Sequence, residues 1–234
     1  MRFIIIILTF STLVGYSQEN NKADENNGFV KSVALEYHRN LRNLDFSELN
    51  TRLTDLNLSN SFSENVSANY IGIVWNFNFL KEKTFLGLYF SSVERNTSNN
   101  AVDLDSKLRT LRADLGYKLF TNNYFTLSFT AGLIFDQLSL DINNTLDSSE
   151  NFDEAASTYN NQRLENNELI SINLGPRFTY YIFKNLGVFA SFGYQFQLND
   201  SGWKSNDIEL VNAPDLKLDS FFANLGITYR FINN

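Results

Sequence analysis

The chain has 234 residues, a net charge of -7 and an aromatic content of 15%. It contains no cysteine, which excludes disulfides and a lipid-modified cysteine anchor, and its acidic balance argues against a nucleic-acid partner, which needs a basic surface. The composition permits an exported, β-rich protein, and the length suits one domain.

The first 28 residues have the pattern of a processing segment followed by a tether. Arg2 supplies one positive charge, residues 3–14 are mostly apolar, and residues 15–17 are suited to cleavage by a signal peptidase. A retained membrane helix is disfavoured because this run is short for a span. We predict a cleaved signal peptide at residues 1–17, a polar periplasmic tether at 18–28 and a barrel domain at 29–234.

Eight later stretches alternate large apolar residues with small or polar ones, the period of a strand with one apolar face. They cover residues 29–39, 67–79, 84–95, 107–119, 124–138, 168–183, 186–198 and 217–231. Short links alternate with long polar connections between them. This rhythm predicts an all-β fold, an eight-stranded antiparallel up-and-down transmembrane β-barrel with long extracellular loops.

Two connections and one strand carry further signals. Leu49 and Leu53 recur at helical spacing after Asp45, so a short helix is expected within residues 46–57, leaning on the barrel rim. The acidic connection at 141–167 lacks the glycine and terminal glutamate of a calcium loop, which favours a solvated surface loop. Pro176 predicts an interrupted ladder within its strand.

The two faces of the strands indicate which side contacts lipid. One parity is large, apolar and aromatic. The other is smaller and more polar, with glycines such as Gly72 that make room in a narrow lumen, and with charges at Glu36, Arg112, Asp114, Lys118, Arg177 and Arg230. Because an eight-stranded lumen is just wide enough for side chains, the bulky set should face outward. An exported soluble binding barrel is the disfavoured alternative.

The last strand ends in a recognisable pattern. Asn224, Gly226, Tyr229 and Phe231 have the spacing polar-x-Gly-x-x-aromatic-x-aromatic. This is similar to the C-terminal assembly signal of outer-membrane barrels, and the chain resembles the small outer-membrane β-barrel family of OmpA/OmpX type, including porin-like barrels. The resemblance implies an integral location in the cell outer membrane. It also implies contact with outer-membrane lipid and lipopolysaccharide, and with periplasmic chaperones and the barrel-assembly machinery during biogenesis.

The charges of the polar parity should pair inside the lumen, because an isolated charge in a dry interior costs several kcal/mol. We expect Arg177 to reach Glu36 or Asp114. A structural plug is the favoured interpretation, and a narrow path for small solutes is the alternative.

Enzymatic chemistry has little support in the sequence. His38 is the only histidine, expected at the rim of the barrel with Glu36 on the same face, and no serine partner is identifiable. We therefore expect a non-enzymatic protein without cofactor or metal, acting structurally or through extracellular loops whose ligand, if any, the sequence does not identify. A lipid-modifying enzyme is the second alternative.

Overall fold

The structure, a computed structural model, describes residues 30–55, 62–77, 83–99, 102–143, 162–199, 202–205 and 208–232. The predicted signal peptide and tether lie outside these residues, as does much of the acidic connection. Among the described residues, no helix is long and apolar enough to cross a membrane.

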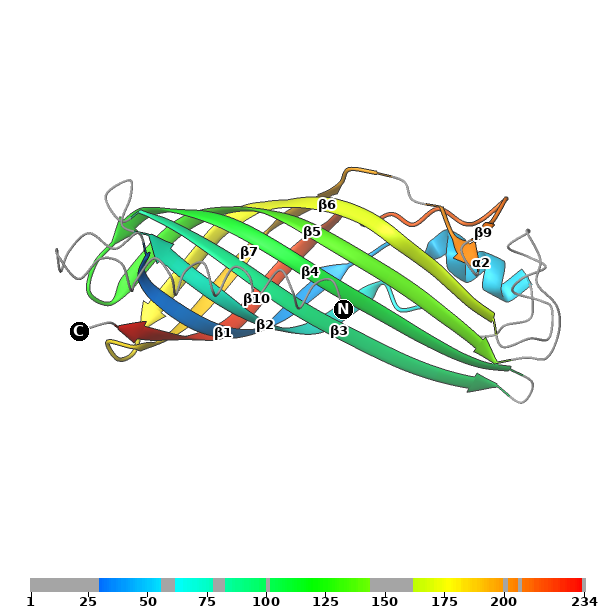
Figure 1. The fold of residues 1–234 in the computed structure, drawn as a ribbon, viewed down its shortest axis with the longest axis horizontal. Coiled ribbons are helices and arrows are strands. Elements are labelled where there is room, and N and C mark those ends of the chain that lie inside the picture. The colour runs from blue at the N-terminus through cyan, green and yellow to red at the C-terminus, as the bar shows by residue number, and fades with distance from the viewer. Residues whose placement is uncertain are drawn as a thin grey trace, which may run out of the picture.

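Eight long antiparallel strands form a closed barrel (Figure 1). They are β1 (Val30–Asn43), β2 (Asn65–Phe77), β3 (Thr84–Asn99), β4 (Val102–Thr121), β5 (Phe125–Asn143), β6 (Gln162–Tyr181), β7 (Leu186–Gln197) and β10 (Ser220–Ile232). The ladder follows chain order from β1 to β7 and then to β10, and β10 pairs with β1 to close it. The predicted eight-stranded barrel is therefore confirmed.

The two ends of the barrel differ. The links between β4 and β5 and between β6 and β7 are short, and they lie at the end where β1 begins and β10 finishes (Figure 1). The helix α2 (Ser47–Asp55) and the short strands β8 (Lys204–Ser205) and β9 (Ile208–Glu209) lie at the other end. Because outer-membrane barrels place short turns in the periplasm, we name these the periplasmic and the extracellular end.

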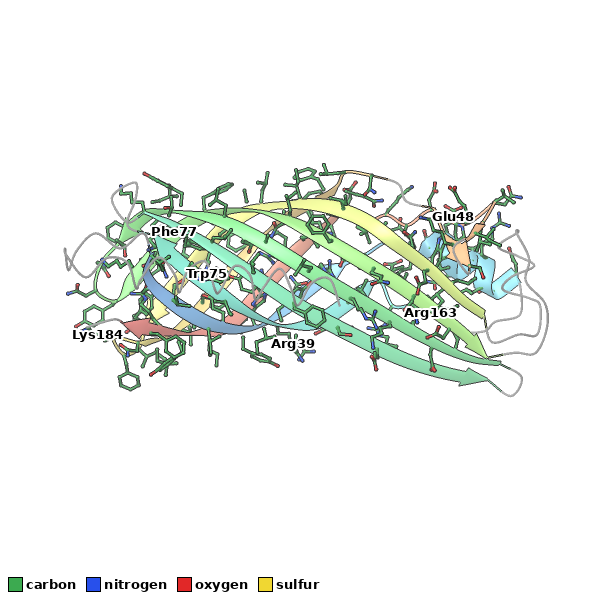
Figure 2. All side chains as sticks on the ribbon, viewed as in Figure 1. Arg39, Glu48, Trp75, Phe77, Arg163 and Lys184 are labelled. Atoms are coloured by element: carbon green, nitrogen blue, oxygen red, sulfur yellow. The ribbon has the colours of Figure 1, made fainter. Side chains whose placement is uncertain are left out.

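The outer surface carries a broad apolar belt. Its large exposed side chains are contributed by most strands and include Leu35, Ile71, Phe90, Leu115, Phe129, Leu133, Phe192 and Leu225. Trp75 and Phe77 belong to the same parity but are buried, in a small cluster with Val30 that packs against Val33, Ile73, Leu86 and Leu88. Figure 2 shows both toward the Lys184 end of the barrel.

Several strands continue beyond their predicted ends because the alternation persists while the polarity of its faces reverses. On β4, Leu115 and Leu111 lie on the outer face, but Arg109 takes the next outward position toward the extracellular end. Over the same stretch the inward positions become apolar, with Leu108 and Leu104 buried. A membrane strand needs only about 9–11 residues, so the remainder of the 20-residue β4 extends past the apolar belt.

The reversed polarity creates an apolar layer inside the extracellular end, which we call the extracellular core. Its buried members come from α2 and the link that precedes it, from the inward faces of strands and from the last connection. They are Leu44, Phe46, Leu49, Leu53, Val66, Leu104, Leu108, Leu138, Leu140, Leu164, Leu169, Trp203, Leu210, Leu216 and Leu218. The predicted helix is thus present, and its leucines pack against inward-facing leucines near the extracellular ends of β4, β5 and β6.

Local hydrogen bonds hold α2 in this position. The Asp45 carboxylate accepts a hydrogen bond from the Ser47 backbone N–H over 2.9 Å, and hydrogen bonds from the Ser47 hydroxyl and N–H lower the pKa of Asp45. The Asn50 side chain exchanges two hydrogen bonds with the backbone of Phe62, over 2.9 and 2.6 Å. The helix is therefore tied to the chain entering β2.

The ladder between β6 and β7 is interrupted where proline was expected to interrupt it. Pairing stops after Leu174 with Tyr194 and resumes at Arg177 with Ser191, so Gly175 and Pro176 have no register partner on β7. Proline supplies no N–H to a ladder.

We predict that a positive charge added to the outer face destabilises the barrel strongly within the apolar belt and only slightly beyond its extracellular edge. Leu133→Arg places a cation among lipid-facing residues and should lower the free energy of unfolding by about 2–4 kcal/mol, whereas Gln137→Arg, two pleats further along β5, should change it by less than about 1 kcal/mol. Urea unfolding of the barrel in lipid vesicles measures both. Equal losses would contradict the position of the belt.

Candidate functional site: the filled lumen

Three arginine–carboxylate pairs lie inside the barrel. Arg177 pairs with Glu36, Arg112 with Asp114, and Arg42 with Asp136. All six residues are buried. Each cation therefore has a counter-charge within hydrogen-bond distance, which is the condition for keeping charges in a dry interior.

The pair between Arg177 and Glu36 crosses the lumen from β6 to β1. Nη1 of Arg177 donates to Oε2 of Glu36 over 3.0 Å, and Nη2 donates to Oε1 over 2.5 Å. The Tyr89 hydroxyl donates to the same carboxylate over 2.9 Å. The guanidinium also lies 3.9 Å from the ring centroid of Phe189, within the range of a cation–π interaction. This bidentate, aromatic-flanked pair joins two strands that are not neighbours in the sheet.

The pair between Arg112 and Asp114 lies within one strand. Both residues point inward from β4, and Nε of Arg112 donates to Oδ1 of Asp114 over 2.7 Å. The Asn173 amide donates weakly to the same oxygen over 3.5 Å. The Arg112 guanidinium lies 5.4 Å from the ring centroid of Phe222. Asp114 is thus used locally and does not partner Arg177.

The third pair was not predicted. Arg42 on β1 donates to Asp136 on β5 through Nη1 to Oδ2 over 2.9 Å, and through Nη2 to the Thr110 hydroxyl over 3.2 Å. The Thr110 hydroxyl donates in turn to Asp136. The first strand was predicted to end at residue 39. Its inward-facing positions continue through Asn40 to Arg42, so following the same alternation for three more residues would have identified this cation.

His38 lies within the lumen and not at the rim, because β1 extends well beyond it. Its ring stacks on Tyr70 with centroids 5.0 Å apart and meets Tyr89 and Phe189 edge-on at 5.1 and 5.6 Å. Neither ring nitrogen has a hydrogen-bond partner among the described residues. Glu36, the nearest expected partner, is occupied by Arg177. The surroundings of His38 are therefore those of a packed aromatic side chain.

Arg230 and Lys118 complete the six predicted lumen charges. Arg230 donates to the Tyr181 hydroxyl and stacks over that ring at 4.5 Å near the periplasmic end. Lys118 is half-buried and lines a small periplasmic depression with Thr126 and Thr179. Four of the six predicted charges are thus joined as two ion pairs, Arg230 contacts Tyr181, and Lys118 lines the same depression as Arg177.

Glycines on the inward parity provide the space that the large side chains fill. A Cβ at Gly72 would lie 2.2 Å from the Tyr89 ring, and a Cβ at Gly132 would lie 2.0 Å from Oδ1 of Asp114. The Tyr89 ring and the Asp114 carboxylate thus fit in the lumen because these two neighbouring positions have no side chain.

The four residues of the terminal pattern divide between the two faces of β10. Asn224 is buried in the lumen, where its amide accepts from Asn40 over 2.6 Å and donates to Ser191 over 2.8 Å. A Cβ at Gly226 would lie 2.4 Å from Cβ of His38. Tyr229 and Phe231 are exposed on the outer surface, with their rings edge-to-face at 5.3 Å.

No group of three or more histidine, aspartate or glutamate side chains within the described part of the chain could hold a metal ion.

No family model matches the chain, and no curated protein matches it. Among solved structures, a major outer membrane protein from Thermus thermophilus has a TM-score of 0.54 and 12% identity, covering 86% of this chain and 98% of that one. Ail, the attachment invasion locus protein of Yersinia pestis, has a TM-score of 0.45 and 15% identity, with coverage of 86% and 97%. Neisserial surface protein A has a TM-score of 0.47 and 12% identity, with coverage of 86% and 97%.

The fold is that of the small outer-membrane barrels. At these identities the likeness concerns fold and not activity. Together with the apolar belt around a polar lumen, the fold confirms the predicted outer-membrane location.

We predict that breaking the pair between Arg177 and Glu36 costs much more than replacing it. Glu36→Gln or Arg177→Met alone should destabilise by about 3–5 kcal/mol, because each leaves a buried group without its partner. The double variant should lose clearly less than the sum of the two. Urea unfolding in vesicles provides this double-mutant cycle.

The matched control is the exposed pair between Lys107 and Glu94. Lys107→Gln should cost at most about 1 kcal/mol, as is usual for surface ion pairs. Additive effects in the lumen cycle would contradict the coupling inferred from the geometry.

Proposed function

We propose that this protein is a non-conducting integral outer-membrane barrel that acts structurally in the envelope or through its extracellular end. The observation that carries the proposal is the filling of the lumen. Two ion pairs cross-link the inward faces of β1, β5 and β6, a third lies within β4, and Tyr70, Tyr89, Phe189 and Phe222 pack between them. An eight-stranded lumen has little width left once such side chains occupy it.

The extracellular core supports the same proposal at a second level. Leu49 and Leu53 of α2 are completely buried, as is Trp203, whose indole N–H donates to the carbonyl of Pro214 over 2.9 Å. A dry apolar layer would oppose the passage of ions even if the polar layer beneath it relaxed, because an ion there would lose its hydration without compensation.

A narrow solute path is the second candidate. In its favour, a small depression of about 30 Å³ lies inside the periplasmic end, lined by Asn76, Lys118 and hydroxyl-bearing residues. It ends at Arg177, whose guanidinium is held by Glu36 and by the ring of Phe189. The depression therefore fits a vestibule below a closed layer better than part of a continuous pore.

A lipid-modifying enzyme has no comparable support. Such an enzyme would have to use His38, and that ring is enclosed by Tyr70, Tyr89 and Phe189.

The proposed partners follow from location. The apolar belt would contact outer-membrane lipid and lipopolysaccharide. The exposed rings of Tyr229 and Phe231 would be available to the barrel-assembly machinery and periplasmic chaperones before insertion.

Planar-bilayer recording tests the proposal. The purified wild-type barrel should show no persistent conductance. Glu36→Ala combined with Arg177→Ala removes the cross-lumen pair and should produce brief openings, because water can then enter the polar layer.

Arg163→Ala is the control, since this exposed side chain pairs with Glu165 outside the lumen. It should remain as silent as the wild type. A persistent wild-type conductance would overturn the filled-lumen proposal and favour the solute path.

A further inference from the structure

Strands β3 to β6 form a sheet that continues past the rest of the barrel at the extracellular end (Figure 1). The ladder between β3 and β4 continues to Asn99 and Val102, and the ladder between β5 and β6 continues to Ile142 and Gln162. The flanking strands β2 and β7 stop pairing with this sheet earlier. The extension therefore has two edges of its own, one on β3 and one on β6.

A hairpin covers the edge on β6. Lys204 and Ser205 of β8 pair with Glu165 and Leu164 of β6, and β9 pairs in turn with β8. An uncovered edge presents unpaired backbone N–H and C=O groups, and proteins commonly cover such edges with further chain. The last connection of the protein supplies this cover on one side of the extension.

The edge on β3 has no such cover among the described residues. Pairing between β2 and β3 ends at Tyr70 with Ser91, and residues 92–99 pair with β4 alone among the described strands. Beyond Ser91 a side chain bridges β2 and β3, since Nη2 of Arg95 donates weakly to the Asn65 carbonyl over 3.5 Å. On the side facing away from β4, every second residue of 92–99 thus offers an N–H and a C=O to a further strand.

The split between β2 and β3 opens onto apolar side chains, which line a depression of about 30 Å³. They come from the two strands, from β4 and β5 and from the segments on either side of α2, and they are Phe46, Phe62, Val66, Val93, Leu108 and Leu138. Most of them belong to the extracellular core. The volume would hold about two water molecules, so a small aliphatic side chain fits.

The opposite face of the same stretch meets water. Ser92 and Glu94 are exposed on the outer side of β3, and Glu94 pairs with Lys107 of β4. A strand added beside residues 92–99 would therefore have apolar surroundings on its inward side and polar surroundings on its outward side. These surroundings suit a segment in which small apolar residues alternate with polar ones.

We propose that the open edge of β3 binds an extended segment of a partner protein by strand addition. The backbone of this segment would bond to residues 92–99, and its small apolar side chains would enter the split beside Val66 and Val93. The recess between β2 and β3 suits a single strand better than the edge of a second copy. Such binding rests on the proposed action through the extracellular end and is independent of conduction by the lumen.

Fluorescence anisotropy of a labelled peptide tests the proposal on the full barrel in detergent micelles. The probe is a peptide of about nine residues in which valine alternates with threonine. Its control has the same side chains with every backbone nitrogen methylated, which removes the N–H donors. The wild type should bind the unmodified peptide at least about tenfold more tightly, because several hydrogen bonds are lost together in the control. Hydrogen exchange should be slowed within residues 92–99 and not at the edge that β8 covers.

Two variants separate the faces of β3. Val93→Asp places a charge inside the split and should weaken binding about tenfold, because the charge would be desolvated by the peptide. Ser92→Asp places the same charge on the exposed outward face and should change binding less than about twofold. Circular dichroism checks that each variant is folded, and Val93→Thr, which keeps the shape of valine, is used if Val93→Asp fails.

Equal binding of the two peptides, exchange protection outside residues 92–99, or equal losses in the two variants would overturn the proposal. A dimer joined through this edge that the peptide does not dissociate, measured by sedimentation, would overturn it as well. Conductance is recorded separately. Absence of peptide binding would therefore leave the filled-lumen proposal standing, and an open lumen would leave strand addition standing.

Discussion

The ion pair between Arg177 and Glu36 reflects the main constraint on this structure, which is that a narrow lumen must be filled while its polar groups are satisfied. β6 and β1 are not neighbours in the sheet, so the pair connects opposite walls of the barrel. Its geometry is bidentate, and Tyr89 supplies a further donor to the carboxylate. Such saturation offsets the large cost of removing two charges from water.

The same constraint determines where small residues are needed. Tyr89 reaches Glu36 only because Gly72, opposite it on β2, has no side chain that would collide with its ring. Asp114 likewise needs Gly132 beside it. The glycines and the ion pairs are therefore parts of one packing solution, and a change in either would disturb the other.

Beyond the apolar belt the strands leave the lipid, so apolar side chains face inward there and polar side chains face outward. Water surrounds the outer face there, so Arg109 and Lys107 point outward and Leu108 points inward. The extracellular end is consequently built like a small soluble domain, with α2 and Trp203 supplying apolar surface that the strands cannot provide alone. One strand can pass from lipid into water because its side chains alternate between the same two faces, whichever of the two is apolar.

Local patterns account for what the sequence could predict. The alternation identified eight strands, and the short and long connections gave their order. The identity of the polar parity indicated that Arg177 would need a carboxylate. These features depend on periodicity and on the cost of unpaired charge, both of which are readable from residues close together in the chain.

The sequence pattern did not show which carboxylate would pair with Arg177. Whether Arg177 meets Glu36 or Asp114 depends on the stagger of the strands around the barrel, and that stagger is set by the whole ladder. Arg42 was overlooked because the outer apolar pattern fades before the strand ends. His38 was placed at the rim for the same reason, and its aromatic enclosure by Tyr70 and Phe189 depends on contacts between strands that are distant in sequence.

A remaining question is why the lumen keeps ion pairs at all, since well-packed apolar residues can replace a buried pair with little loss of stability or with a gain. Apolar residues on the lumen parity would make residues 110–120 of β4 and 125–136 of β5 continuously hydrophobic, and such runs favour retention of the chain in the inner membrane during export. Keeping one parity polar lets the chain cross the inner membrane as an exported polypeptide. The pairing of Arg177 with Glu36, Arg112 with Asp114 and Arg42 with Asp136 then makes that polarity compatible with a closed barrel.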